Sequence, residues 1–178
     1  MAEWSVAYNW MMDAEDAQRA CRQVVDNAPR GVAGRCFAIS GINSGVFPAE
    51  FAAIAALPQE KREAAVEAFY HRHFWNQWLA GLNSDELCKR VFDFSVNAGG
   101  VEAVRCLQQA IDHSAGVARV AEDGLWGKAT VAAANNAADA QALTATFIRL
   151  RSEYYRAIVA GNPACARLLP NWLARAER

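Results

Sequence analysis

The most constraining feature of this chain is an apolar stretch over residues 91–100 that carries two polar side chains on one face. Apolar residues such as Val91 and Phe94 recur there at three- and four-residue spacing, which predicts a buried helix. Asp93 and Asn97 are four positions apart, so they lie one turn from each other on the same face. Burying an unpaired carboxylate or amide is costly. Two interpretations therefore stay open: a core helix whose polar pair caps a neighbouring loop, or the wall of a binding site.

The composition favours helices, in one domain of ordinary size or in two small lobes that share a core. The chain has 178 residues, of which 53% are hydrophobic, so it can bury a sizeable core. Alanine is abundant and runs of β-branched residues are scarce, which favours helices over strands. A formal net charge of −1 argues against nucleic acid or an anionic membrane surface as the main partner.

The cysteines and the amino terminus indicate where the protein is made. Its five cysteines are odd in number and scattered without a C-x-x-C pair, which predicts neither a disulfide framework nor a zinc site. We expect buried thiols in a protein made in a reducing compartment. The amino-terminal residues do not form a basic segment followed by an apolar run, so we expect no signal peptide. No apolar run is long enough to predict a membrane-spanning helix.

Periodicity and breakers predict a series of helices along the chain. The expected helices run from Trp4 to about Val25, Pro48 to about Leu57, Gln59 to about Trp78, Asn83 or Ser84 to about Ala98, the glycines to Asp112, Lys128 to Asn136, Asp139 to about Ala160, and from Pro163 onward. Between Asp26 and Pro48 turn residues are frequent, which predicts a small loop or β-hairpin near residues 30–45. Long ordered loops in compact domains are often functional.

Several motifs follow one another in the second half of the chain. They are the aromatic cluster at residues 69–75, the stretch 91–99, Leu107-Gln108-Gln109-Ala110, Asp123-Gly124-Leu125-Trp126-Gly127-Lys128-Ala129-Thr130, and the late Arg151, Tyr154-Tyr155 and Asn171-Trp172-Leu173-x-Arg175. In this order they closely resemble the predicted peptidoglycan-binding part of the family 108 glycoside hydrolases, which are lysozyme-like muramidases of phage endolysins and bacterial relatives. The resemblance covers most of residues 69–178 and implies an all-α, lysozyme-like helical fold.

The amino-terminal half resembles that family less closely. Glu15 best matches the glutamate that the family carries late in its first helix, but Asp16 and Ala17 follow where glycines are usual. The segment Gly41-Ile42-Asn43 fits the family's Gly-Ile pair, while Ala38 stands where a threonine is usual. Asp26, with Gly31 or Gly34, matches the family's loop only loosely. These departures are compatible with a divergent subgroup whose chemistry is intact, and equally with a relative that has lost it.

The resemblance implies a catalytic role for Glu15 in cleaving the β-1,4 bond between N-acetylmuramic acid and N-acetylglucosamine. A general acid must keep its proton at neutral pH, which burial beside apolar groups can arrange. Without the resemblance, we would expect Glu15 to be a solvent-exposed residue of an acidic helix end. Asp26 and Asp93 are the candidates for a second carboxylate that activates water or acts as nucleophile, and Asp26 is the one we expect to be catalytic. The reaction needs no cofactor.

Further residues are candidates for holding the glycan strand. Asn97 is suited to bind an acetamido group or to position water, and Asp93 to support the surrounding structure. Trp75 and Tyr155 are the aromatic residues expected to line a saccharide groove, with Asn43 as a further contact, whereas most other aromatics are expected in the core. His71 and His73 do not share a helix face, so we predict no metal site.

We therefore expect a catalytic lobe over residues 1–88 and a peptidoglycan-binding lobe over residues 89–178, packed as one compact unit in a monomer. The protein would be made in the bacterial cytoplasm and reach the wall through a holin, a secretion apparatus or a fused partner, without inserting into the membrane. The rival hypothesis is a catalytically inactive peptidoglycan-binding module, or a phage or secretion accessory protein that kept the fold. A helical protein–protein adaptor is a third.

Overall fold

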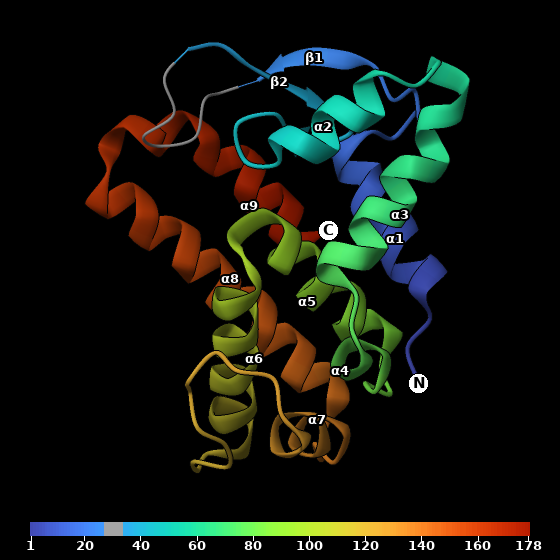
Figure 1. Ribbon diagram of the computed structural model, residues 1–178. Helices are drawn as coiled ribbons and strands as arrows, with labels where there is room; N and C mark the ends of the chain where they lie inside the picture. Colours follow the sequence, from blue (N-terminus) through green and yellow to red (C-terminus); the bar gives the residue numbers. More distant parts are fainter. Residues whose placement is uncertain (27–33) are drawn as a thin grey trace. The chain divides into compact units, whose positions relative to one another are not determined.

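The chain forms two compact units in this computed structural model, which describes residues 1–26 and 34–178. One unit is Tyr8–Trp75, and the other combines Met1–Ala7 with Asn76–Arg178. Figure 1 labels the elements of both. The position between residues 88 and 89, where we expect the two lobes to divide, lies within α5 (Asp85–Ala98). A division of function between two lobes stays a prediction.

The unit Tyr8–Trp75 joins helices to a small antiparallel sheet. Its elements are the greater part of α1 (Trp4–Glu15), β1 (Gln23–Asp26), β2 (Cys36–Ile39), β3 (Ile42–Asn43), α2 (Pro48–Ala55), the 3-10 helix η1 (Gln59–Lys61) and α3 (Arg62–Phe74). The strands pair in the order β1-β2-β3, and Figure 1 labels the first two. Ile39 pairs with Ile42, so Ser40 and Gly41 form a two-residue turn, and both have positive φ angles of 47° and 81°. The expected hairpin is confirmed, although Gly31 lies outside the described residues.

The first helix is ten residues shorter than predicted, because it ends at Glu15 and not near Val25. The side chain of Asp16 accepts hydrogen bonds from the backbone N–H groups of Ala20 and Cys21, and these bonds fold the chain into a loop. Arg19 and Cys21 have positive φ angles of 51° and 48°, which a right-handed helix does not accommodate. The apolar residues after this loop enter strand β1.

The long helix predicted over Gln59–Trp78 is also divided. Trp75 has an extended backbone with ψ of 137°, which ends α3 at Phe74. The side chain of Asn76 then accepts hydrogen bonds from the backbone N–H groups of Trp78 and Leu79, and so caps the short helix α4 (Gln77–Ala80). The apolar periodicity predicts one continuous helix, but the extended backbone at Trp75 and the Asn76 cap divide it into α3 and α4.

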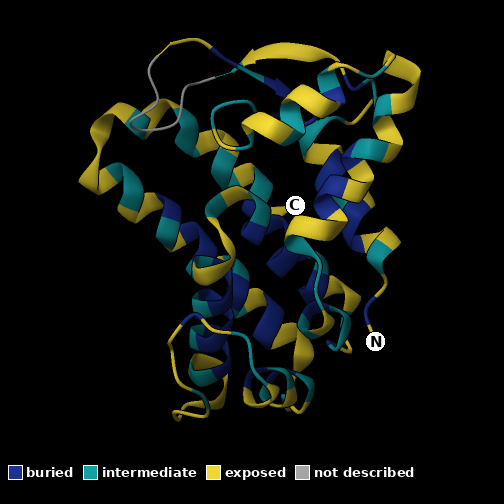
Figure 2. Ribbon diagram, viewed as in Figure 1, coloured by how far each residue is buried: buried dark blue, intermediate teal, exposed yellow. Residues whose placement is uncertain are grey.

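The other unit is built from helices that match the predictions closely. Besides α4 they are α5 (Asp85–Ala98), α6 (Gly100–Ala115), α7 (Lys128–Asn135), α8 (Ala140–Gly161), the 3-10 helix η2 (Pro163–Leu168) and α9 (Leu169–Glu177). Ser84 caps α5 by accepting from the Leu87 N–H, and the break between α5 and α6 falls at Gly99. Helix α6 packs against α5 and α8, and α8 also packs against α9. Figure 2 shows buried residues gathered along α5, α6 and α8.

The core of this unit contains aromatic rings and unreactive thiols. The Phe94 ring lies edge-to-face on Phe147 and Tyr155, with centroids 6.1 Å and 5.8 Å away. Cys88 and Cys106 are free and buried, and burial raises the pKa of each thiol to about 12. The expectation of a mostly helical fold with a small hairpin is confirmed. Among the described residues, no helix combines the length and apolar character needed to cross a membrane.

Candidate functional site

The carboxylate of Glu15 lies at the end of α1 against the turn between β2 and β3. The contact is close because Gly41 has no side chain: a Cβ atom there would collide with the Glu15 carboxylate, with Cδ only 2.8 Å away. The same Cβ would lie 2.7 Å from the hydroxyl of Tyr70, which donates a 2.7 Å hydrogen bond to the Ser40 carbonyl. Glu15 is half-buried. The fold therefore brings two sequence-predicted residues, Glu15 and Gly41, into contact at a partly sheltered position.

Asp16, the next residue, fixes this arrangement. Its carboxylate accepts a 2.8 Å hydrogen bond from the Ser40 hydroxyl in addition to those from the Ala20 and Cys21 N–H groups. Partial burial raises the pKa of Asp16, but the hydrogen bonds from Cys21, Ser40 and Ala20 outweigh it and leave the pKa below its ordinary value. In the sequence Asp16 stands out only as a departure from the usual glycine, which does not predict this role. The available signal was an aspartate directly after a helix, a position that favours local side-chain to backbone bonds.

Asp26 and Asn43 form a second polar pair in the same unit. Asp26 ends β1 and Asn43 ends β3, and the Asn43 side-chain amide donates a 2.8 Å hydrogen bond to Asp26 Oδ2. The Oδ1 atom of Asn43 accepts from the Gly45 N–H at 2.7 Å, so the amide is held at both ends. Both side chains are partly exposed. The structure therefore joins the predicted base to a predicted substrate contact, at the edge of the sheet.

Asp93 is bound by two arginines in the other unit. Its carboxylate, fully buried, accepts a 2.6 Å hydrogen bond from Arg151 on α8 and 2.8 Å and 3.1 Å bonds from Arg175 on α9. Arg151 is itself 1% exposed and lies over the Phe94 ring, with its Cζ atom 5.1 Å from the ring centroid. Because Asp93 has no contact with solvent, any effect it has on a substrate is indirect. Its hydrogen bonds join three helices, α5, α8 and α9.

Asn97 is the exposed end of this polar network. The Tyr155 hydroxyl accepts a 3.1 Å bond from Arg151 Nε and donates a 2.6 Å bond to Asn97 Oδ1. The Tyr155 ring is buried and stacked on Trp172, with centroids 5.4 Å apart, so its face is not available to a sugar. Asn97 itself is exposed. With Oδ1 occupied, its amide N–H group is the part that is oriented for a ligand.

A buried glutamine connects the two central motifs of the sequence. Gln108 on α6 donates hydrogen bonds to Asp123 Oδ1 at 2.8 Å and to the Leu125 carbonyl at 3.1 Å. Its Oε1 atom accepts from the Gly124 N–H at 2.9 Å. The Leu125 N–H and the Gln108 amide together lower the pKa of the Asp123 carboxyl. One side chain thus holds the turn that precedes α7, which explains why this glutamine accompanies an Asp-Gly turn.

The remaining predicted contact is Trp75. It follows α3, is half-buried, and its expected place in a saccharide groove stays a prediction. Within residues 1–26 and 34–178, no group of three or more His, Cys, Asp or Glu side chains is arranged to hold a metal ion.

Gln108, Arg151 and Arg175 all lie in one continuous part of the chain. Residues 102–177 match the family described as a predicted peptidoglycan domain. The match runs from the first turn of α6 to the end of α9, and it relates this part of the chain to peptidoglycan. It does not extend to Glu15, Asp26 or Asp93. No curated protein and no solved structure matches the chain.

Proposed function

We propose that the protein is a peptidoglycan hydrolase of the muramidase type, related to the family 108 glycoside hydrolases and lysozyme-like in its fold. The observation that carries the proposal is the position of Glu15, whose partly sheltered carboxylate lies at a helix end against the Gly41 turn. The peptidoglycan match of residues 102–177 supports the substrate class. In this reaction Glu15 donates a proton to the glycosidic oxygen as the bond to N-acetylmuramic acid breaks.

Water completes the reaction at the sugar carbon from the opposite face. Asp26 is our candidate base, since its Oδ2 atom is oriented by the Asn43 amide and its side chain is partly exposed. A mechanism without a dedicated base is the alternative. Asn97 would bind an acetamido carbonyl through its oriented amide N–H group, with Tyr155 and Asp93 acting through it. The enzyme would act at the cell wall after export through a holin, a secretion apparatus or a fused partner.

Lysis of purified peptidoglycan in a gel tests the proposal. The wild type should clear the gel, whereas Glu15→Gln should lose at least 100-fold of the activity, roughly the contribution of a general acid. Asp13→Asn is the matched control, because Asp13 lies on the same helix and its side chain is 58% exposed. The released fragments should carry new N-acetylmuramic acid reducing ends, detected by mass spectrometry after borohydride reduction. Lysis that survives in Glu15→Gln would remove Glu15 from the mechanism.

A catalytically inactive peptidoglycan-binding module is the second candidate. It is favoured by the extent of the family match, which covers residues 102–177 and leaves the proposed acid outside. Sedimentation of the protein with insoluble peptidoglycan distinguishes the two candidates. Binding by the wild type without any lysis would establish the module, and lysis that depends on Glu15 would establish the hydrolase.

A further inference from the structure

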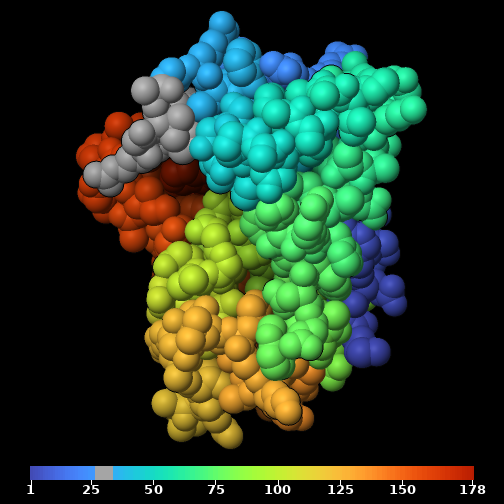
Figure 3. Space-filling view, in the orientation of Figure 1, coloured from blue at the N-terminus to red at the C-terminus, as the bar shows by residue number. Residues whose placement is uncertain are grey.

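A cavity of about 550 Å³ lies between the end of α6, helix α7 and the start of α8. All of these elements belong to the unit that contains residues 76–178 and to the part of the chain that matches a peptidoglycan domain. The volume is within the range of roughly 300–1,000 Å³ that is usual for sites that bind small ligands. The connection from α6 to α8 lies at the surface in Figure 3, so this region is accessible from solvent.

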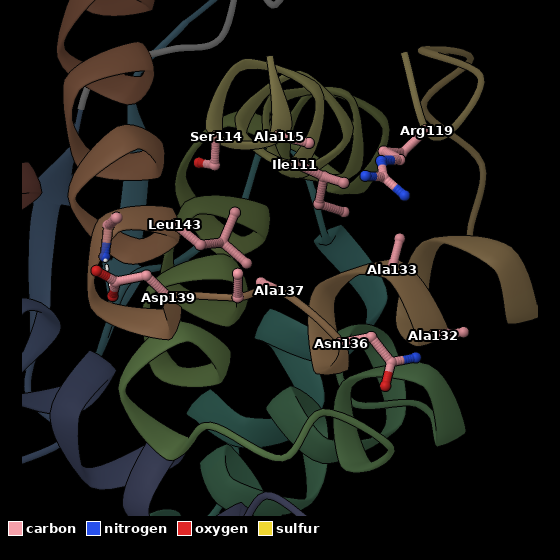
Figure 4. A pocket seen from close by; sticks show the side chains of 12 residues that line it. Ile111, Ser114, Ala115, Arg119, Ala132, Ala133, Asn136, Ala137, Asp139 and Leu143 are labelled. Carbon is pink, nitrogen blue, oxygen red and sulfur yellow. Dashed lines mark hydrogen bonds between the residues drawn. The ribbon is translucent and has the colours of Figure 1, made fainter. Parts of the chain in front are cut away.

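Small side chains line most of this cavity. Alanine methyl groups contribute much of the wall, together with Ile111 and Leu143 (Figure 4). None of the lining residues in the described part of the chain is aromatic, so these residues offer no ring face on which a sugar could stack. Its shape and composition are instead suited to a ligand whose own side chains are small and apolar.

Among the described residues that line the cavity, Arg119 is the one cation, and it lies at one side. The side chain of Arg119 extends from the loop after α6 toward Ala133 (Figure 4). The loop is fixed because the backbone N–H groups of Arg119 and Val120 donate to Asp112 Oδ1, at 2.7 Å and 3.2 Å. The Arg119 guanidinium itself has no hydrogen bond or ion pair with any of the described residues. The backbone of Arg119 is held beside the cavity, and its exposed guanidinium can pair with a carboxylate supplied by a ligand.

The other polar groups of the cavity do not neutralise this cation. Asp139 lies across the cavity from Arg119 in Figure 4, and its Oδ1 atom caps α8 by accepting from the N–H groups of Gln141 and Ala142, both at 2.9 Å. Asn136 follows the last turn of α7 and places a side-chain amide beside the cavity. An amide can pair with the backbone of a bound peptide. The lining thus offers a cation that can pair with a carboxylate, an amide that can form hydrogen bonds, and small apolar surfaces.

We propose that this cavity binds the stem peptide of peptidoglycan, which is a short peptide with alanine methyl groups and free carboxylates. Arg119 binds a carboxylate of the peptide, and the alanine-lined wall accepts its methyl groups. This inference rests on the proposed function for its substrate, but it concerns the peptide and not the glycan strand. The protein would then recognise two parts of the same polymer through separate groups of residues.

Titration with a glycan-free peptide tests this binding site. The probe is the pentapeptide L-Ala-γ-D-Glu-L-Lys-D-Ala-D-Ala, added to the full-length protein labelled with ¹⁵N. We expect saturable shifts of the amide signals of Ala133 and Ala142, and roughly tenfold weaker binding by Arg119→Gln. Arg149→Gln is the matched control, because Arg149 is an exposed arginine of α8 whose partner is Glu153. A second variant, Ala133→Phe, should fill the cavity and weaken binding without a change in charge.

The outcomes separate this inference from the proposed hydrolase. Wild-type protein that lyses peptidoglycan but shows no saturable peptide binding would overturn the inference alone. Equal affinity of wild type and Arg119→Gln would also overturn it, provided that both proteins give folded spectra. Peptide binding that depends on Arg119 and Ala133, in a protein without lytic activity, would support peptide binding in the cavity and contradict the proposed hydrolase activity.

Discussion

The carboxylate of Asp93 accepts a 2.6 Å hydrogen bond from Arg151, a residue 58 positions later in the chain, and both side chains are almost completely buried. A buried ion pair of this kind compensates charges that would be very costly alone. Its position between α5 and α8 makes it a determinant of how these helices pack, rather than a group that contacts substrate directly.

Asp93→Asn should therefore destabilise the protein strongly. The variant keeps the size of the side chain but leaves the Arg151 charge uncompensated, which costs about 3–5 kcal/mol of unfolding free energy. Urea unfolding followed by circular dichroism measures the change. Glu153→Gln is the control, since its pair with Arg149 is about half exposed and contributes about 0.5 kcal/mol or less. Equal costs for the two variants would contradict the role given to Asp93.

Tyr155→Phe should destabilise the protein more than Tyr154→Phe. The Tyr155 hydroxyl bridges Arg151 and Asn97, and its loss leaves a buried guanidinium N–H without an acceptor, at a cost of about 1–3 kcal/mol. The Tyr154 hydroxyl has no hydrogen bond to the described residues, so its removal should change stability by less than about 0.5 kcal/mol. Thermal unfolding compares the two. The side-chain amide signals of Asn97 should also move in Tyr155→Phe only.

Gly41→Ala should strongly reduce lysis, whereas Gly34→Ala should not. Both glycines have positive φ angles, 81° and 96°, so an alanine at either position costs about 1–2 kcal/mol of stability. Only the added methyl at Gly41 collides with the Glu15 carboxylate, because nothing lies within 4 Å of a Cβ atom at Gly34. Displacement of the acid should lower the rate roughly 100-fold in the gel assay. Equal activity of both variants would argue against Glu15 as the acid.

The stability contributed by Asp16 should depend on pH. Its pKa is lower in the folded protein than in the unfolded chain, so the contribution is complete above the unfolded-state pKa of about 4. It is lost as the pH falls through the lower folded-state pKa. Asp16→Asn should therefore cost about 1–2 kcal/mol at pH 7, and the difference from wild type should shrink below pH 4.

The matched control for Asp16 is Asp13→Asn. Asp13 pairs with Arg19 at the surface, at 3.2 Å, so its replacement should change stability by less than about 0.5 kcal/mol at either pH. Urea unfolding at pH 7 and pH 3 measures both variants. A difference between wild type and Asp16→Asn that grows on acidification would contradict the assignment.

Gln108→Glu should disrupt the turn before α7, although Gln109→Glu should be tolerated. A glutamate at position 108 would bring a carboxylate against Asp123 and the Leu125 carbonyl, in place of the amide that donates to both. We expect a loss of about 3 kcal/mol, since the new charge is buried and faces two acceptors, although it keeps the Gly124 N–H as a donor. Gln109 is the adjacent, partly exposed residue of α6 and should change stability by less than about 0.5 kcal/mol. Denaturant unfolding provides the measurement.

The helices of residues 83–178 could be predicted because their signals are local. The Ser84 cap, the glycine break after Ala98 and the proline at residue 163 each act within one turn of the residue that carries them. The helix bounds predicted from periodicity were wrong where hydrogen bonds from a side chain changed the course of the backbone. Asp16 ended α1 early, and Asn76 started a new helix inside a continuous apolar pattern.

The roles given to the candidate site residues stay predictions, and their contacts could not be predicted from the sequence. The spacing of Asp93 and Asn97 predicted a shared face with partners, whereas the partners Arg151, Tyr155 and Arg175 lie 58 to 82 positions away. The sequence by itself determined the helical class, the breaks between helices and the likeness of the second half to peptidoglycan-binding proteins, because those depend on local pattern and motif. The tertiary structure alone decided that Glu15 lies against Gly41 and that Asp93 is buried between two arginines, because such contacts depend on how distant segments pack.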